Sequence, residues 1–385
     1  MLSKLPTNLS PYIALRLLKK YCDSGNLALA HKLFDEIPEP NLHSWTILIS
    51  AYTKQGRAND AIKLYSILRK QNIQPDRLAL LSVAKACAAS GDLNKAKEIH
   101  EDAISVGFHR DISVGNALVD MYGKCKCYEL AQRVFTELPV KDVISWTSLL
   151  SCYVNCGLHR QALAALRQMR LNGLWPNSVT LSSVLPACSE LKDLNSGREI
   201  HGYVVKNGMG ENEFVSSAII DMYASCLSLR QAQLVFDNMP VRDLVSWNVI
   251  LTAYFTNGEF DKAVNLFGQM RFQRVELNCD SWNAVIAGCM QNQRNTQALE
   301  MLIKMQEFGL KPNQITITSV LPACTSLDSL RGGKEVHGYV YRNVISDDIT
   351  ITTALVYMYA KCGELEISRQ FSIQCLKGIL SLGIQ

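Results

Sequence analysis

The sequence lacks a strong excess of charge of either sign. It has 39 Lys and Arg residues against 35 Asp and Glu residues among 385, which gives a formal net charge of +4. This balance excludes a polybasic protein that holds its partner by charge alone. A nucleic acid could still bind, but shape and hydrogen bonding would have to supply much of the affinity.

Long apolar runs and a secretory signal are also missing, although 48% of the residues are hydrophobic. No apolar run approaches the ~18 residues of a membrane-spanning helix, so we expect no membrane insertion. The 13 cysteines are an odd number in a chain without a secretory signal, which favours reduced thiols over a disulfide framework. The hydrophobic fraction can form a buried core, which excludes a wholly disordered chain.

The motifs of several enzyme classes are absent as well. We find no P-loop, no nucleophile elbow and no glycine-rich dinucleotide loop in the chain, and each of these carries a specific chemistry. Strand-type alternation of apolar and polar residues is also absent. We therefore expect no sheet.

What the sequence does have is an internal repeat. The dipeptide Ser-Trp recurs with its tryptophans spaced by 101, 101 and 35 residues. These tryptophans are Trp45, Trp146, Trp247 and Trp282. Three further markers recur at intervals of 101 and 136 residues: Cys87, Cys188 and Cys324; His100, His201 and His337; and Tyr122, Tyr223 and Tyr359. An interval of 101 fits two repeats of 35 residues and one of 31. The chain is therefore an array of such triplets with one extra repeat.

The phase of these markers fixes the repeat boundaries. The complete repeats are 11–41, 42–76, 77–111, 112–142, 143–177, 178–212, 213–243, 244–278, 279–313 and 314–348, and an incomplete one runs from 349 to about 371. Repeats 11–41, 112–142 and 213–243 have 31 residues, and the other complete ones have 35. Residues 1–10 remain as a short N-terminal segment, and residues 372–385 remain as a divergent C-terminal tail.

Each repeat is predicted to form two helices. In repeat 244–278 the apolar residues recur at three- and four-residue steps on either side of Asn257-Gly258, where glycine suits a left-handed helix end. The two apolar stripes are Trp247, Ile250, Leu251 and Tyr254, then Phe260, Ala263, Val264, Phe267 and Met270. A helical hairpin of this size cannot bury its apolar face alone, so stacked copies predict an all-α solenoid of helix–turn–helix repeats.

These residues resemble the pentatricopeptide repeat. The matching motifs are Ser-Trp-Asn-x-x-Ile at 281–286, Asn-Gly at 257–258, Ala-x-x-Leu-Phe-x-x-Met at 263–270 and Lys-Pro-Asn at 311–313. The triplets resemble the plant organellar subclass with long and short repeat variants, with the long variant at 321–324 and 333–337 and the short variant at 354–363. The resemblance covers residues 11 to about 371 and implies a right-handed α-solenoid superhelix.

The resemblance further implies binding of single-stranded RNA, at roughly one base per repeat. In this family the fifth and last residues of a repeat select the base. The fifth residue follows the core tryptophan by one step, about 100° around the helix, so it can face a groove. The tetratricopeptide array is the nearest look-alike, but it has ~34-residue units and a different signature.

Six repeats carry a usable pair of fifth and last residues. By resemblance the pairs are Thr46 with Asp76 for G, Asn116 with Asp142 for U, Thr147 with Asn177 for A, Ser217 with Asp243 weakly for G, and Asn248 with Asn278 and Asn283 with Asn313 for pyrimidines, C over U. Asp only accepts hydrogen bonds and suits the ring N–H of G and U, whereas Asn donates and accepts and can meet A or C. Read from amino to carboxyl end as 5′ to 3′, the pairs predict the target x-G-x-U-A-x-G-Y-Y-x-x.

The second residue of each repeat flanks the base in this family and is usually aliphatic. Ile144 and Val245 fit this pattern, whereas His43 and Asp280 depart from it. Asp280 is the more serious departure, because a carboxylate near a phosphate backbone is repelled.

Other interpretations apply to the recurring residues. The tryptophans could stack on bases, but their place on the apolar stripe favours the core. Equivalent cysteines lie three or four repeats apart and cannot meet, so we expect small buried apolar groups rather than disulfides or metal ligands. The fixed register of His100, His201 and His337 favours a structural or surface role over catalysis. For the six pairs the alternative is an ordinary solvated polar surface.

Many members of this subclass carry a cytidine deaminase domain, which needs His-x-Glu and Cys-x-x-Cys to hold zinc. Here none of the seven histidines is followed two residues later by Glu, and no Cys-x-x-Cys occurs. We therefore expect no enzyme, no cofactor and no metal site.

The resemblance implies a specificity factor for C-to-U RNA editing in the mitochondrion, or alternatively the chloroplast, with a deaminase or accessory editing factor in trans. The alternatives are a protein-interaction solenoid of tetratricopeptide type, or a role in RNA stabilisation or cleavage guiding.

Overall fold

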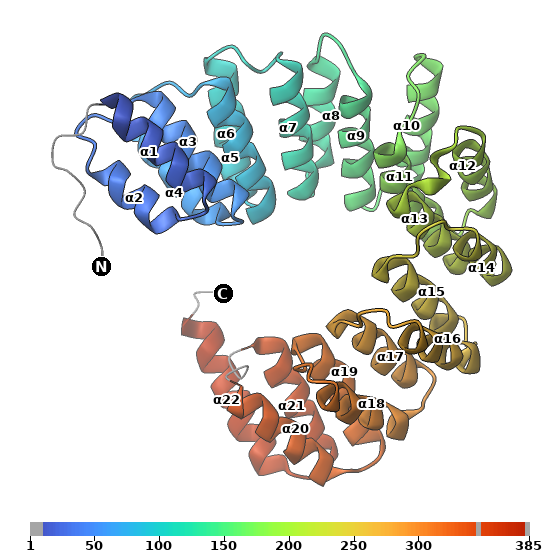
Figure 1. The fold of residues 1–385 in the computed structure, drawn as a ribbon. Coiled ribbons are helices and arrows are strands. Elements are labelled where there is room, and N and C mark those ends of the chain that lie inside the picture. The colour runs from blue at the N-terminus through green and yellow to red at the C-terminus, as the bar shows by residue number, and fades with distance from the viewer. Residues whose placement is uncertain (1–10, 344–347, 382–385) are drawn as a thin grey trace. The chain divides into compact units, whose positions relative to one another are not determined.

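The computed structural model describes residues 11–343 and 348–381, which form helices joined by short turns (Figure 1). No strand occurs within these ranges, as the sequence predicts. The predicted segment 1–10 and residues 382–385 lie outside the described residues. Two compact bodies make up the chain: the N-terminal body ends at Leu191 and the C-terminal body begins at Lys192.

Eleven helices open the repeats. They are α1 (Pro11–Asp23), α3 (Leu42–Lys54), α5 (Arg77–Ser90), α7 (Ile112–Lys124), α9 (Val143–Asn155), α11 (Ser178–Leu191), α13 (Glu213–Ser225), α15 (Leu244–Thr256), α17 (Cys279–Gln291), α19 (Gln314–Ser326) and α21 (Ile349–Lys361). In every case the first residue of the predicted repeat is also the first residue of the helix. We call these the first helices.

A second helix follows each first helix. These are α2 (Leu27–Asp35), α4 (Ala58–Lys70), α6 (Leu93–Ser105), α8 (Tyr128–Glu137), α10 (His159–Leu171), α12 (Leu194–Lys206), α14 (Leu229–Asp237), α16 (Phe260–Phe272), α18 (Asn295–Glu307), α20 (Leu330–Arg342) and α22 (Leu365–Ser381), with the short 3-10 helix η1 (Met209–Glu211) after α12. Gly56, Gly157 and Gly258 separate the two helices of their repeats at φ of +74°, +74° and +77°. The left-handed conformation predicted at Gly258 is therefore confirmed.

The hairpins stack in series inside each body. In the N-terminal body the first helices α1, α3, α5, α7, α9 and α11 pack one against the next, and in the C-terminal body α13, α15, α17, α19 and α21 do the same. A second helix such as α4 or α18 packs on the first helix of its own repeat and on that of the following one. The predicted all-α architecture of stacked helical hairpins is confirmed.

The four Ser-Trp tryptophans belong to the core of their bodies, as predicted. Their side chains are 1–5% exposed. Each packs edge-on against a phenylalanine of the preceding second helix, with ring centroids 4.6–5.1 Å apart, in the pairs Phe34–Trp45, Phe135–Trp146, Phe236–Trp247 and Phe267–Trp282. Such aromatic pairs join consecutive repeats and contribute beyond their buried area. These tryptophans are not available to stack on bases.

The recurring histidines also join consecutive repeats. Nδ1 of His100, His201 and His337 lies 3.0, 2.9 and 2.8 Å from the hydroxyl of Tyr122, Tyr223 and Tyr359, respectively, on the next first helix. Burial lowers the pKa of all three imidazoles, so these rings stay neutral near pH 7. The predicted structural role is confirmed.

The recurring cysteines form no disulfides with one another, and Cys87, Cys188 and Cys324 are buried, as predicted. Cys87 also contacts Cys125 of the following repeat, a contact that was not predicted from the sequence. Burial raises the pKa of Cys87 to about 12. This thiol therefore stays protonated and unreactive near neutral pH.

The end of the described chain remains helical. Helix α22 continues to Ser381, so most of the predicted divergent tail, 372–385, extends a helix of the last repeat. Within residues 11–343 and 348–381, no helix is both long enough and apolar enough to cross a membrane.

Candidate nucleic-acid interface

The last residue of a repeat is the N-cap of the next first helix. Its side-chain oxygen accepts the backbone N–H of the third residue of that helix at 2.7–3.2 Å. The ten residues that do this are Asn41, Asp76, Asp111, Asp142, Asn177, Asn212, Asp243, Asn278, Asn313 and Asp348. Asn and Asp are both strong N-caps, and each is worth about 1 kcal/mol against Ala.

This capping role was missed at the level of sequence, although its signal is an Asn or Asp directly before ten of the eleven predicted repeat starts. The cap uses one side-chain oxygen. The second carboxylate oxygen of Asp, or the amide nitrogen of Asn, remains for another partner. These residues are therefore more than a solvated polar surface, and capping explains why they are Asn or Asp without fixing which of the two occurs.

The fifth residues lie one turn into the first helices and are well shielded. Thr46, Asn116, Ser217 and Asn283 are 4–7% exposed, and Thr147 and Asn248 are half-buried. Three of the six predicted pairs are in direct contact at 3.3 Å, and these contacts are Thr46 Oγ1 to Asp76 Oδ1, Asn116 Nδ2 to Asp142 Oδ1, and Asn283 Nδ2 to Asn313 Oδ1. Fifth and last residues of these repeats thus form one polar site.

The other three pairs have no direct side-chain bond. Thr147 is linked to Asn177 through the hydroxyl of Thr180, which lies 2.7 Å from Thr147 Oγ1 and 3.0 Å from Asn177 Oδ1. Ser217 Oγ and Asn248 Oδ1 are buried without a hydrogen-bond partner, as is Asn116 Oδ1. They are three of eight such side-chain atoms among the described residues. Buried polar atoms are rarely left unpaired, so these oxygens are candidates to bind a ligand.

Burial and hydrogen bonding compete at Asp142. Burial raises the pKa of its carboxyl group, but hydrogen bonds from Ser145 and from the Asn116 amide outweigh that effect and hold the pKa below its ordinary value. Asp142 is therefore a carboxylate near pH 7. It can only accept hydrogen bonds, which is the property that selects a ring N–H.

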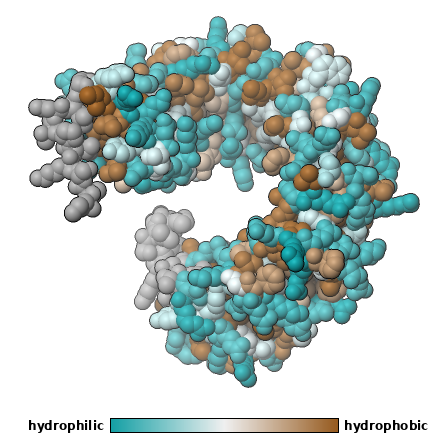
Figure 2. All heavy atoms as spheres, in the orientation of Figure 1, coloured by the Kyte–Doolittle hydropathy of each residue, from teal (hydrophilic) through white to brown (hydrophobic). Residues whose placement is uncertain are grey.

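The second residues form a series of exposed apolar side chains. Seven of the eleven are large and apolar and are 53–74% exposed: Tyr12, Leu78, Ile144, Val179, Phe214, Val245 and Ile315. His43 and Asp280, which depart from the aliphatic pattern, are exposed as well. Apolar atoms reach the surface in patches among hydrophilic ones (Figure 2). In five of these seven repeats the apolar side chain accompanies a polar fifth residue, and this combination suits a ligand with flat apolar faces and polar edges.

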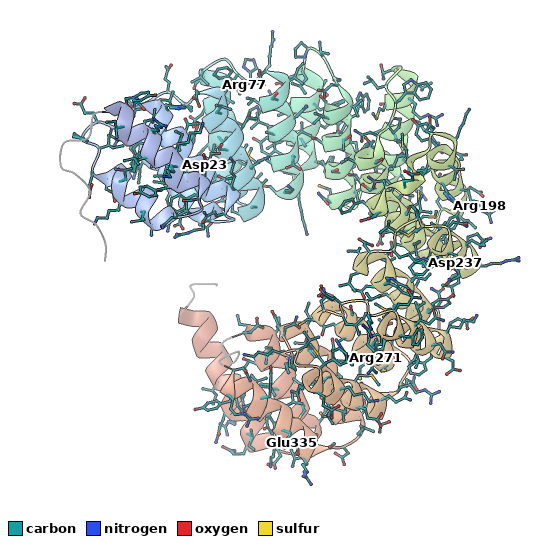
Figure 3. All side chains as sticks on the ribbon, viewed as in Figure 1. Asp23, Arg77, Arg198, Asp237, Arg271 and Glu335 are labelled. Carbon is teal, nitrogen blue, oxygen red and sulfur yellow. The ribbon has the colours of Figure 1, made fainter. Side chains whose placement is uncertain are left out.

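Exposed charges of both signs occur in each body. Asp23 and Arg77 lie on the N-terminal body, and Arg198, Asp237, Arg271 and Glu335 lie on the C-terminal body (Figure 3). This mixture agrees with the small net charge of the sequence. The charges therefore support binding of a ligand by local hydrogen bonds better than binding by overall charge attraction.

A cavity brings these features together in the C-terminal body. It has a volume of about 680 Å³ and is lined by residues of α13, α15 and α17, including Val245, Asn248, Thr252, Asp280 and Ala284. Val245 and Asp280 are second residues of consecutive repeats, and Asn248 is the fifth residue between them. Asp280 Oδ2 also accepts a hydrogen bond from Asn278 Nδ2 at 3.1 Å. The volume lies in the range of small-molecule sites.

Comparison with known proteins identifies the repeats. A model of the PPR repeat family matches residues 40–89, 141–190, 242–281 and 277–326, and a PPR repeat model matches 116–143. The chain belongs to the pentatricopeptide repeat (PPR) family.

Curated relatives of this PPR chain come from Arabidopsis thaliana. The pentatricopeptide repeat-containing protein At4g33990 is 33% identical over 92% of this chain and 50% of the relative. The protein At3g53360, named as mitochondrial, is 30% identical over 92% and 55%, respectively, and At1g15510, named as chloroplastic, is 32% identical over 88% and 39%. The chain spans about half the length of the curated relatives it matches.

A solved structure of the same fold is that of the pentatricopeptide repeat protein PPR10 in complex with an 18-nucleotide psaJ RNA element. Its TM-score with this PPR chain is 0.65 at 17% identity, covering 97% of this chain and 56% of PPR10. At this identity the likeness shows the fold.

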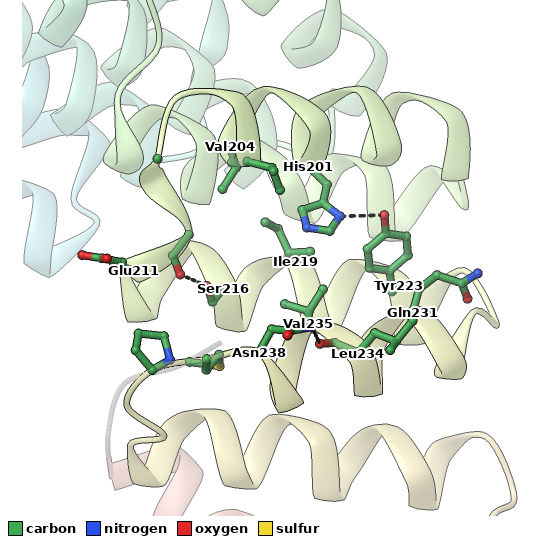
Figure 4. A pocket seen from close by; sticks show the side chains of 15 residues that line it. His201, Val204, Glu211, Ser216, Ile219, Tyr223, Gln231, Leu234, Val235 and Asn238 are labelled. Carbon is green, nitrogen blue, oxygen red and sulfur yellow. Dashed lines mark hydrogen bonds between the residues drawn. The ribbon is translucent and has the colours of Figure 1, made fainter.

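A second cavity of the PPR chain lies away from the fifth residues. It has a volume of about 620 Å³ and is lined by α12, α13 and α14, with His201, Ile219 and Tyr223 on its wall (Figure 4). Ile219 follows the fifth residue Ser217 by two positions, about 200° around the helix. This cavity and the fifth residues therefore lie on different sides of the first helix.

Proposed function

We propose that this PPR chain binds single-stranded RNA in a sequence-specific manner, with about one nucleotide per repeat. The cavity at Asn248 carries the proposal, because it joins the second residues of consecutive repeats and a fifth residue whose Oδ1 is unpartnered. Val245 and Asp280 flank the base, and Asn248 meets its polar edge. The RNA in the PPR10 complex supports the same ligand class.

The proposal assigns the base choice to Thr46, Asp76, Asn116, Asp142, Thr147, Asn177, Ser217, Asp243, Asn248, Asn278, Asn283 and Asn313. The predicted target is x-G-x-U-A-x-G-Y-Y-x-x. Oδ1 of each last residue is bound to a helix N–H, so the outward-facing atom is a carboxylate oxygen for Asp and an amide nitrogen for Asn. That difference supports a ring N–H beside Asp and a ring acceptor beside Asn.

We further propose that the protein acts in an organelle, in the mitochondrion with the chloroplast as the alternative, since its relatives carry both names. The long and short repeats support a role as specificity factor for C-to-U RNA editing. In this proposal a deaminase or an accessory editing factor supplies the catalysis in trans. RNA stabilisation or guiding of cleavage is the alternative outcome.

The test is binding of the purified chain to an RNA of the predicted sequence and to a scrambled RNA of equal composition, by fluorescence anisotropy at two salt concentrations. We expect at least about tenfold tighter binding to the predicted RNA, because each mismatched hydrogen-bonded base costs ~1 kcal/mol or more. Equal affinity for both RNAs removes the specificity claim. No binding to either favours a protein ligand instead.

A further inference from the structure

The third residue of a repeat is the residue whose N–H is capped, and in six repeats it carries a hydroxyl group. These residues are Ser44, Ser145, Thr180, Ser246, Ser281 and Thr316, and all are at most 3% exposed. Ser44, Ser145 and Ser281 donate their hydroxyl to Oδ1 of the capping residue at 2.9–3.2 Å, and Ser246 donates to the Asp243 carbonyl. The two threonines reach further, to the fifth residue of the repeat before them.

Thr316 fixes the orientation of Asn283. Its hydroxyl lies 2.6 Å from Asn283 Oδ1 and 3.0 Å from Asn313 Oδ1, and it accepts the Asn313 N–H at 3.1 Å. A hydroxyl has one proton, and we assign it to the shorter contact, in which Thr316 donates to Asn283 Oδ1. Asn283 Oδ1 thereby already accepts one hydrogen bond inside the protein, and Asn283 Nδ2 donates to Asn313 Oδ1. The Asn313 amide nitrogen is left to face a ligand.

Thr180 plays the equivalent part in the N-terminal body. Thr147 donates its own proton to the Val143 carbonyl at 2.7 Å. The 2.7 Å contact between the hydroxyls of Thr147 and Thr180 therefore uses the proton of Thr180. Thr180 thus joins a fifth and a last residue that have no direct bond to each other: its hydroxyl donates to Thr147, and its backbone N–H donates to Asn177 Oδ1 at 2.9 Å.

The neighbouring repeats supply natural counterparts. Ser281 reaches Asn278 but not Asn248, whose Oδ1 is unpartnered. At Ala79 there is no hydroxyl, and Thr46 reaches Asp76 directly. Threonine is β-branched and stiffer at χ1 than serine, so its hydroxyl can be held toward the preceding repeat.

We propose that Thr316 and Thr180 are positioning residues that set the base preference of the repeat before their own. This proposal rests on the RNA binding proposed above. It implies that repeats 244–278 and 279–313, which share the Asn–Asn pair, differ in preference. In repeat 244–278, Asn248 Oδ1 accepts from the cytosine amino group and separates C from U. In repeat 279–313, Asn283 Oδ1 already accepts a hydrogen bond from Thr316, and the Asn313 amide meets the acceptors of either pyrimidine.

The experiment measures binding to RNAs that differ in one base at the position of repeat 279–313. We expect the wild-type chain to bind C and U there within about twofold, and Thr316→Val to favour C by about three- to tenfold, the range of one hydrogen bond. Thr316→Ser keeps a hydroxyl but, like Ser281, should bond only the last residue of the pair, so the ratio should shift toward C as in Thr316→Val. Ser281→Ala is the matched control, because that hydroxyl contacts only the last residue of the pair.

The outcomes separate this inference from the proposed function. A wild-type chain without sequence preference overturns RNA recognition itself. A wild-type chain with preference, but with an unchanged C-to-U ratio in Thr316→Val, overturns only the role of the threonine. If Thr316→Val does not fold, Ser281→Thr tests the same idea in reverse: it should occupy Asn248 Oδ1 and lower the C-to-U ratio of repeat 244–278 by about threefold or more. An unchanged ratio there also overturns the inference.

Discussion

Repeats 244–278 and 279–313 carry asparagine at both the fifth and the last position, yet their side chains have different partners. In the first repeat, Asn278 donates to Asp280 and Asn248 Oδ1 has no partner. In the second, Asn283 bonds both Asn313 and Thr316. The identity of two residues therefore does not define the hydrogen-bonding groups that a repeat presents. The first residues of the next repeat complete the site.

The two repeats also differ in how their tryptophans pack. Trp282 contacts both Phe267 and Phe308, whereas Trp247 packs edge-on against Phe236. Trp282→Ala should lower the free energy of unfolding by about 3–5 kcal/mol, and Trp247→Ala by less, since fewer ring contacts are lost. Urea unfolding measures both. Phe272→Ala is the control, because a ring that is 90% exposed should change stability by less than about 0.5 kcal/mol.

Thr147→Asn should reproduce in repeat 143–177 the side-chain arrangement of repeat 279–313. It would place an asparagine amide beside Asn177 and Thr180, which copies Asn283, Asn313 and Thr316. We expect the preference of repeat 143–177 to shift from A toward a pyrimidine by about tenfold, and to separate C from U as weakly as repeat 279–313 does. Binding to four RNAs that vary only at this position measures the shift. An unchanged preference for A would refute the transferred pairing.

Substitutions at Asn278 can test its capping role and its proposed base contact separately. Asn278→Ala should lower the free energy of unfolding by about 1 kcal/mol, because the N–H of Ser281 loses its acceptor. Asn278→Asp preserves the cap and should leave stability within a few tenths of a kcal/mol, while the base preference of repeat 244–278 moves toward U. Thermal unfolding and single-base RNA variants check the two effects. A stable Asn278→Ala variant would contradict the capping role.

Asp280 gives the smallest expected effect. Asp280→Val removes a carboxylate from the cavity at Asn248 and releases the amide of Asn278. We expect RNA affinity to rise by about threefold at low salt, because repulsion of the phosphate backbone is relieved, and by less at high salt. Asp280→Asn, which removes the charge but retains an acceptor, should give most of the gain. Equal affinity of all three proteins would place Asp280 away from the RNA.

The periodic features of the fold were predictable from sequence. Every predicted repeat start coincides with the start of a first helix, and in ten of the eleven cases apolar spacing and an Asn or Asp cap mark that point together. The burial of the tryptophans was predictable as well, because they lie on the apolar stripe of the first helices. The partner of Asn283 was not predictable, because it depends on a hydroxyl three residues into the next repeat and on distances of a few tenths of an ångström. Contacts between different markers, such as Cys87 with Cys125, were missed because only equivalent positions were compared.

The capping residues have an evolutionary consequence. Asn and Asp hold the next helix about equally well, so exchanging an amide for a carboxylate at a repeat boundary leaves folding almost untouched. Under the base recognition proposed above, the same exchange reverses the group offered to a base from donor to acceptor. A lineage of such proteins would then change its target one letter at a time, without passing through unstable intermediates.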